Sequence, residues 1–303
     1  MFFSSVLVQL LTLTGTATLA SAGPIDKRQA ATNVYTFSSP RSAEGIAARS
    51  NGQLLVSFFD KAELWSLDPA TKKAAKLVSF TDATCSAGIT EIAPDVFAVV
   101  AGQYGMSGGN KPGSWAIWKV DMTSGTAKAS ILKKVPESGM WNGLTTLNNE
   151  TILIGDATNG AVWRMNVNTG NYSIAIQDAT MKPGTGIPMG IDGLRYSNGT
   201  VYFTNISKNT LNKVSVDATG KATGSITPIW SNTIADDLWV GPDGSAYVAT
   251  SSNNKIQKVA PDGKVSTAAS VSGSTACVLG RTDTDKNTLY IATNSGAIAS
   301  VKV

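Results

Sequence analysis

One recurring position carries the residues best suited to chemistry in this 303-residue chain. It occurs in six short segments, and in five of them the next residue is glycine or alanine. The six residues are Glu44, Ala87, Asn142, Asp192, Asp236 and Thr275. If the segments superpose around a common axis, three carboxylates and one amide converge at one end of it. The alternative interpretation of each position is a solvated polar residue that merely starts a strand after a turn.

A narrow space that holds three carboxylates needs a cation or a proton to offset their charge. Ca²⁺ is the natural cation, because it takes carboxylate and carbonyl oxygens as ligands. Without a metal, at least one carboxyl group must have a raised pKa, since neighbouring negative charges disfavour ionisation. Either outcome predicts a reactive site.

The composition excludes several classes of enzyme. The chain contains no histidine, which rules out Ser–His–Asp and Cys–His catalysis and zinc sites built on histidine. Proton transfer must therefore fall to carboxylates, tyrosine or lysine. The glycine-rich stretch 105–109 lacks the Lys-Ser/Thr ending of a phosphate-binding loop.

Apolar residues are expected above the carboxylates, on the loops 103–114, 136–141 and 181–190. We predict that Tyr104, Trp141 and Met189 line a substrate site there. The other apolar residues of these loops are Met106, Met140, Met181 and Ile187. The loop 103–114 is either a lid over the mouth or a surface excursion. A pocket of this kind suits a mostly hydrophobic small molecule with a few polar groups.

The elements that position these residues repeat along the chain. The second strands of the repeats begin at Leu54, Val96, Thr151, Val201, Ala246 and Leu289, a period of 42 to 55 residues. Repeats of this length with hairpin turns predict an all-β, six-bladed β-propeller that forms one domain over residues 29–303. The last repeat lacks a fourth strand, and we expect residues 33–37 to supply it and close the ring.

The N-terminus predicts export. Residues 1–22 resemble a secretory signal peptide, with an apolar run over 6–13 and a small-residue cleavage site at 20–22. The run is too short to span a membrane, so no membrane segment should remain after its removal. The pair Lys27-Arg28 is either a processing site, which would end a propeptide at residue 28, or an ordinary charged pair. We therefore expect a protein of the secretory pathway.

The remaining sequence features concern modification and partners. Four Asn-X-Ser/Thr sequons predict glycosylation at Asn149, Asn171, Asn198 and Asn205. The formal net charge is +4 and the basic residues are dispersed, which argues against nucleic-acid binding. We expect a monomer. The only two cysteines, Cys85 and Cys277, are either a disulfide or two separate buried thiols.

Several motifs resemble the senescence marker protein/gluconolactonase family, also called regucalcin-like. They are Glu44-Gly45, Trp141-Asn142-Gly143-Leu144, Asp192-Gly193-Leu194 and Asp236-Asp237-Leu238. The resemblance implies a six-bladed propeller whose mouth holds a divalent metal on Glu44, Asn142, Asp192 and Asp236. Asp192 stands where the family has an asparagine, which adds negative charge. The resemblance also implies that Asp236 is the base in lactone hydrolysis.

Two further stretches, residues 244–250 and Gly280-Arg281-Thr282, are similar to a secreted fungal branch of that family. This branch includes hetero-Diels–Alderases, which join a tropolone quinone-methide-like diene to a macrocyclic terpene.

Three hypotheses follow. The first is a pericyclase that needs no cofactor, in which Asn142, Asp192 and Asp236 hydrogen-bond the polar diene and the apolar loops hold the terpene alkene. The second is a metal-dependent lactonase with Ca²⁺ or another divalent ion. The third is a non-catalytic secreted protein that binds an apolar ligand.

Overall fold

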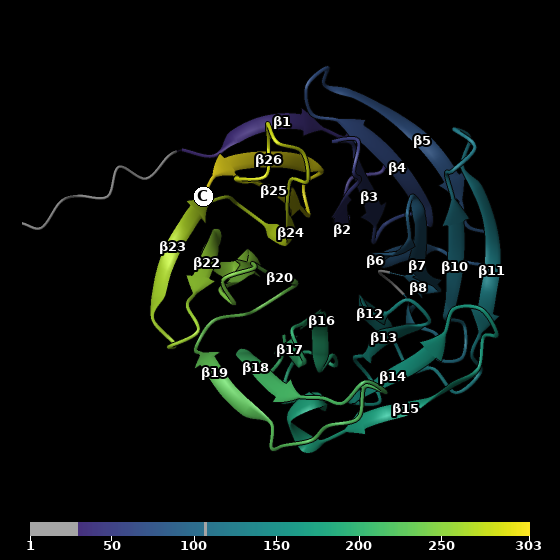
Figure 1. The fold of residues 1–303 in the computed structure, drawn as a ribbon, viewed down its shortest axis with the longest axis vertical. Helices are drawn as coiled ribbons and strands as arrows, with labels where there is room; N and C mark the ends of the chain where they lie inside the picture. The colour runs from purple at the N-terminus through teal and green to yellow at the C-terminus, as the bar shows by residue number, and fades with distance from the viewer. Residues whose placement is uncertain (1–29, 106–107) are drawn as a thin grey trace, which may run out of the picture.

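The structure is a computed structural model that describes residues 30–105 and 108–303. Six antiparallel four-stranded sheets stand as blades around a common axis (Figure 1), which confirms the predicted six-bladed β-propeller. The predicted signal peptide, Lys27-Arg28 and Met106 lie outside the described residues. Within the described part, no helix is long and apolar enough to cross a membrane.

Each blade runs from an inner strand at the axis to an outer strand at the rim. Blade one is β2 (Ala43–Ala48), β3 (Leu54–Phe58), β4 (Glu63–Asp68) and β5 (Lys73–Ser79). Blade two is β6 (Cys85–Ala93), β7 (Val96–Gly102), β10 (Ala116–Asp121) and β11 (Lys128–Lys134). Blade three is β12 (Trp141–Asn148), β13 (Thr151–Asp156), β14 (Ala161–Asn166) and β15 (Tyr172–Gln177).

The second half of the ring repeats this order. Blade four is β16 (Ile191–Ser197), β17 (Thr200–Asn205), β18 (Thr210–Ser215) and β19 (Thr227–Ser231). Blade five is β20 (Leu238–Val240), β21 (Ala246–Thr250), β22 (Lys255–Val259) and β23 (Val265–Ser270). Blade six combines β24 (Ser274–Leu279), β25 (Thr288–Thr293) and β26 (Ala297–Lys302) with β1 (Thr32–Thr36). Two short 3₁₀ helices cover Ala179–Met181 and Ser251–Asn253.

The two ends of the chain close the ring together. β1 pairs antiparallel with β26, with Thr32 opposite Ser300 and Thr36 opposite Ala297. The prediction that the N-terminal segment supplies the missing strand is therefore confirmed. This pairing covers the edge that β26 would otherwise expose to other chains.

Glycines let the inner strands approach one another closely at the axis. A Cβ at Gly143 would lie 2.3 Å from the carbonyl oxygen of Asp192, and one at Gly88 would lie 2.5 Å from that of Asn142. Each of these two glycines thus packs against the backbone of the residue that occupies the recurring position in the next blade. This crowding explains why a side chain is excluded at these two positions.

The regular pairing of the inner strands is interrupted at the same place. The register shifts between Ala43 and Ile46 in β2, and equivalent shifts occur in β6, β12, β16 and β24. Side chains replace the lost ladder bonds: the Gly193 amide donates to Thr204 Oγ1 at 2.8 Å. Bulges of this kind turn a side chain out of the sheet, here towards the axis.

Candidate active site at the acidic end of the channel

The recurring residues converge, and we call Glu44, Asn142, Asp192 and Asp236 the acid cluster. The Asn142 amide nitrogen Nδ2 donates to Glu44 Oε1 at 3.1 Å and to Asp192 Oδ1 at 2.5 Å, so side chains from three blades meet. The carboxyl groups of Asp192 and Asp236 are neighbours, and the charge of Asp192 raises the pKa of Asp236. Asn142 and Asp192 are buried, and Glu44 and Asp236 are partly exposed. Of the two other positions, Thr275 donates to the Ala43 carbonyl at 2.8 Å and Ala87 carries no polar group.

Burial and mutual repulsion raise the pKa of every carboxyl in the cluster. Burial first, then the charge of Asp192, raises the pKa of Glu44 to about 8. Burial raises the pKa of Asp192 to about 7. The pKa of Asp236 is raised well above its usual range by burial and by the charges of Asp192 and Glu44. Because like charges this close cannot all ionise, the cluster holds protons near neutral pH.

The neighbours of the two aspartates act on them differently. The hydrogen bond from Asn142 stabilises the ionised form of Asp192 and so lowers its pKa. Burial, and then the charges of Asp192, Glu44 and Asp237, raise the pKa of Asp236. Asp236 therefore favours its protonated form, a state in which a carboxyl group can donate a hydrogen bond to a substrate.

Asp237 is a fifth member of this region that the sequence reasoning did not assign. Arg195 Nη2 lies 2.9 Å from Asp237 Oδ2, and this guanidinium opposes the effect of burial on the pKa of Asp237. The charge of Asp237 in turn raises the pKa values of Glu44, Asp192 and Asp236. Its position directly after Asp236 was the sequence signal that could have assigned it to this site.

The acid cluster gives no separate support for the predicted calcium site. Among residues 30–105 and 108–303, no group of three or more Asp, Glu, His or Cys side chains is arranged to hold a metal ion. Asn142 directs its amide nitrogen at both Glu44 and Asp192, and Ca²⁺ requires oxygen ligands. Calcium binding by these residues therefore stays a prediction.

An apolar rim stands next to the acid cluster. Phe59 and Tyr104 pack at 4.6 Å between ring centroids, and Met189 is likewise half-buried. The Phe59 amide donates to the Ser42 carbonyl, two residues before Glu44, and Met189 lies three residues before Asp192. Phe59 was not identified in the sequence analysis. This residue directly follows β3, and the end of β3 lies beside the start of β2.

Trp141 does not belong to this rim. Its side chain is completely buried and packs against Trp163 at 6.2 Å between ring centroids. Met140 and Met181 are also buried in the core. The prediction that Trp141 lines a substrate surface is not supported, because its strand begins with an inward-facing core position just before Asn142. Ile187 remains half-buried on its loop.

The predicted lid is packed against its neighbours. Tyr104–Gly105 (β8) and Gly109–Asn110 (β9) pair with each other. Asn110 Nδ2 donates to the Gly139 carbonyl of the next blade at 3.1 Å and Oδ1 accepts from Trp115 at 2.9 Å. The loop thus contacts Phe59 on one side and residue 139 on the other.

The structure also tests the predictions on glycosylation and on the two cysteines. Asn205 is completely buried, and its Nδ2 donates to the carbonyls of Thr180 and Lys182. A glycan on Asn205 is incompatible with this fold, whereas Asn149, Asn171 and Asn198 are exposed. Cys85 and Cys277 are separate buried thiols, so they do not form a disulfide.

Comparison with known proteins agrees with this architecture. No protein-family model matches the chain. It is 24% identical to a Phoma sp. protein named "Putative hetero-Diels-Alderase", over 83% of both chains. A protein of the same description from Sarocladium schorii is 23% identical over 82% of this chain and 74% of its own.

Solved structures share the fold at lower identity. A calcium-binding regucalcin from Agrobacterium tumefaciens superposes with a TM-score of 0.68 at 14% identity, over 90% of this chain and 93% of its own. A gluconolactonase from Xanthomonas campestris gives 0.65 at 13% identity, over 91% of each chain. The chain thus has the all-β propeller fold that the regucalcin and the gluconolactonase share. In sequence it is distantly similar to proteins described as hetero-Diels–Alderases.

Proposed function

We propose that this chain is a pericyclase of the hetero-Diels–Alderase type. In our proposal it joins a tropolone quinone-methide-like heterodiene to a terpene alkene at the acid cluster. The observation that carries the proposal is the Asn142–Asp192 hydrogen bond with the neighbouring carboxyl group of Asp236, beside a half-buried apolar rim. The sequence similarity to the Phoma and Sarocladium proteins supports the same reaction class.

This reaction requires few catalytic groups from the protein. The cycloaddition forms one carbon–carbon and one carbon–oxygen bond while three π bonds become one, and no group leaves. No base, nucleophile or redox partner is consumed, which agrees with a chain that lacks histidine. Holding the two partners in contact lowers the barrier by removing their freedom to separate.

The acid cluster supplies polarisation. In our proposal neutral Asp236 donates its proton in a hydrogen bond to a carbonyl oxygen of the heterodiene. The bond strengthens as electron density moves from the alkene towards that oxygen, so it stabilises the transition state more than the ground state. Asp192 and Asn142 hold Asp236 in place, and Phe59, Tyr104 and Met189 contact the alkene.

The test is the rate and product ratio of cycloaddition between a tropolone quinone methide generated in solution and a macrocyclic terpene. We expect the protein to accelerate the reaction and favour one adduct. Asp236→Ala should lower the rate by about 10²-fold, because it removes one preorganised donor. The matched control is the exposed Asp262→Ala, which should keep the rate. An unchanged adduct ratio with the unmodified protein would refute the proposal.

The carboxylate-rich cluster also favours a second candidate, the metal-dependent lactonase. That activity would appear as hydrolysis of a simple lactone that depends on added Ca²⁺ and stops with a chelator. Chelator-sensitive hydrolysis without cycloaddition would place the lactonase first.

A further inference from the structure

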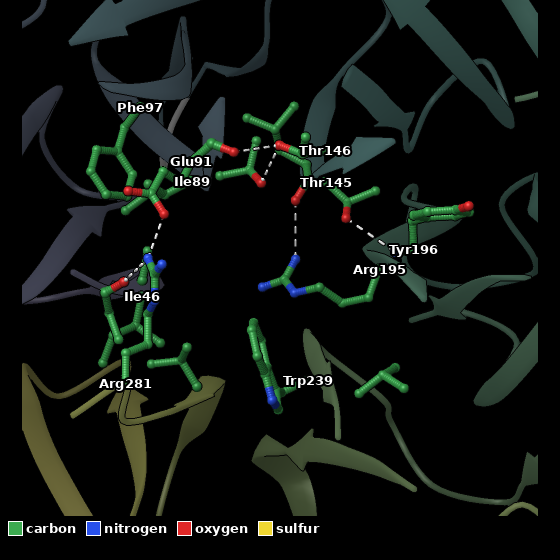
Figure 2. A pocket seen from close by; sticks show the side chains of 16 residues that line it. Ile46, Ile89, Glu91, Phe97, Thr145, Thr146, Arg195, Tyr196, Trp239 and Arg281 are labelled. Carbon is green, nitrogen blue, oxygen red and sulfur yellow. Dashed lines mark hydrogen bonds and ion pairs between the residues drawn. The ribbon is translucent and has the colours of Figure 1, made fainter. Parts of the chain in front are cut away.

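The end of the inner strands away from the acid cluster lines a cavity that the proposed reaction does not use. It has a volume of about 260 Å³ and is lined by residues of all six inner strands or the turns that follow them (Figure 2). On β2 it begins at Ile46, two residues after Glu44, and on β12 at Leu144, two residues after Asn142. With a rise of about 3.3 Å per residue, the cavity and the acid cluster lie at opposite ends of the same strands. We call this region the arginine end.

Two guanidinium groups face each other across the cavity. Figure 2 shows Arg195 and Arg281 reaching into it from opposite sides. Each has a carboxylate partner: Asp237 for Arg195 and Glu91 for Arg281. The gap between two cations is the place where an anion gains most from both.

Arg281 keeps hydrogen-bonding capacity for a ligand. Its Nη1 donates to the Ala48 carbonyl and to Glu91 Oε2. Within the described part of the chain its Nε and Nη2 donors make no hydrogen bond, and these are three of the five N–H groups of a guanidinium. The side chain is 41% exposed, so a ligand can reach it from solvent. Nε and Nη2 together form the edge that grips a carboxylate with two parallel bonds.

The rest of the cavity is aromatic and aliphatic. Trp239 stands below the guanidinium groups, with Arg195 Cζ 6.0 Å from its ring centroid. Its Nε1 is buried and, among the described residues, has no hydrogen-bond partner. Ile46, Ile89 and Phe97 complete the apolar wall. A cavity of about 150 Å³ holds benzene, so this larger one suits one or two fused rings.

We propose that the arginine end is a second binding site, which takes a small planar apolar carboxylate. The ring system lies between Trp239 and the aliphatic wall, and the carboxylate bonds to the free edge of Arg281 and faces Arg195. This proposal does not depend on the reaction at the acid cluster.

Isothermal titration calorimetry of the full chain with 1-naphthoate tests the site. The neutral isostere 1-naphthalenemethanol should bind about tenfold more weakly or worse, because it loses a charge-assisted bidentate pair. Arg281→Gln should weaken naphthoate binding by a similar factor. Glu91→Gln should tighten it, because it removes the anion that competes for Arg281.

The opposite signs of these two changes separate a binding role from general damage, which would weaken both. Arg41→Gln removes one exposed positive charge elsewhere and should leave binding unchanged, and Asp236→Asn should do the same. Equal affinity for the acid and the alcohol, no binding of either, or an unchanged affinity in Arg281→Gln would overturn the proposal.

Discussion

The acidic end and the arginine end use the same six inner strands but neutralise their buried charges in opposite ways. At the acidic end, carboxyl groups from different blades keep protons, and Asn142 donates to two of them. At the arginine end, each guanidinium has a carboxylate within bonding distance. The acidic end therefore responds to pH across the neutral range, whereas the arginine end offsets each positive charge with a neighbouring negative one.

One ion pair connects the two ends. Arg195 lines the arginine end, and its partner Asp237 adds negative charge beside the acid cluster. The closely packed glycines of the inner strands, Gly45, Gly88, Gly143 and Gly193, all follow recurring positions at the acidic end. The comparison shows that the position of a residue along an inner strand decides whether its side chain belongs to the acidic end or to the arginine end.

Loss of the closing strand should abolish both ends together. A chain that begins at residue 37 lacks β1, so β26 exposes its edge and the ring can open. We expect an insoluble product or one without a cooperative thermal transition, and the control is the chain that begins at residue 29. A soluble product with an unchanged melting temperature would show that the two ends do not depend on closure.

Gly143→Ala should damage the acidic end more than the arginine end. The new Cβ would lie 2.3 Å from a backbone oxygen of the next blade, so the blades must separate. We expect a loss of about 3 kcal/mol in the free energy of unfolding by chemical denaturation. Gly155→Ala on the neighbouring strand is the matched control, because its Cβ would meet atoms at 3.5 Å or beyond. Equal losses in the two variants would contradict the close-packing argument.

Stability should fall as pH rises from about 5 to 8. The raised pKa values of Glu44 and Asp192, about 8 and about 7, mean that the folded protein binds more protons than the unfolded chain in this interval. The free energy of unfolding then decreases with pH, by about 1.4 kcal/mol per pH unit for each extra proton that the folded state keeps. Exposed turn aspartates such as Asp68 and Asp217 have lowered pKa values, so they titrate below this interval.

Denaturation at pH 5.5, 7 and 8.5 measures this slope. Asp192→Asn should flatten it, and Asp262→Asn should leave it as it is. A stability that is constant or rises over this range would mean that the acid cluster is not protonated in the fold.

The sequence by itself determined the repeat, the number of blades and the recurring position. It did so because strand periodicity and turn residues are local signals that recur along the chain. The closing strand was also predictable, since one repeat was a strand short. The convergence of Glu44, Asn142, Asp192 and Asp236 followed from the symmetry, once one residue per blade was aligned before a small residue.

Only the tertiary structure decided the rest, because contacts between blades leave no local signal. The core position of Trp141, the buried amide of Asn205, and the packing of Phe59 on Tyr104 depend on residues far away in the chain. The Arg195–Asp237 pair joins residues 42 positions apart. Which carboxyl keeps its proton is likewise set by burial and by neighbours in three dimensions, and those are properties of the closed ring.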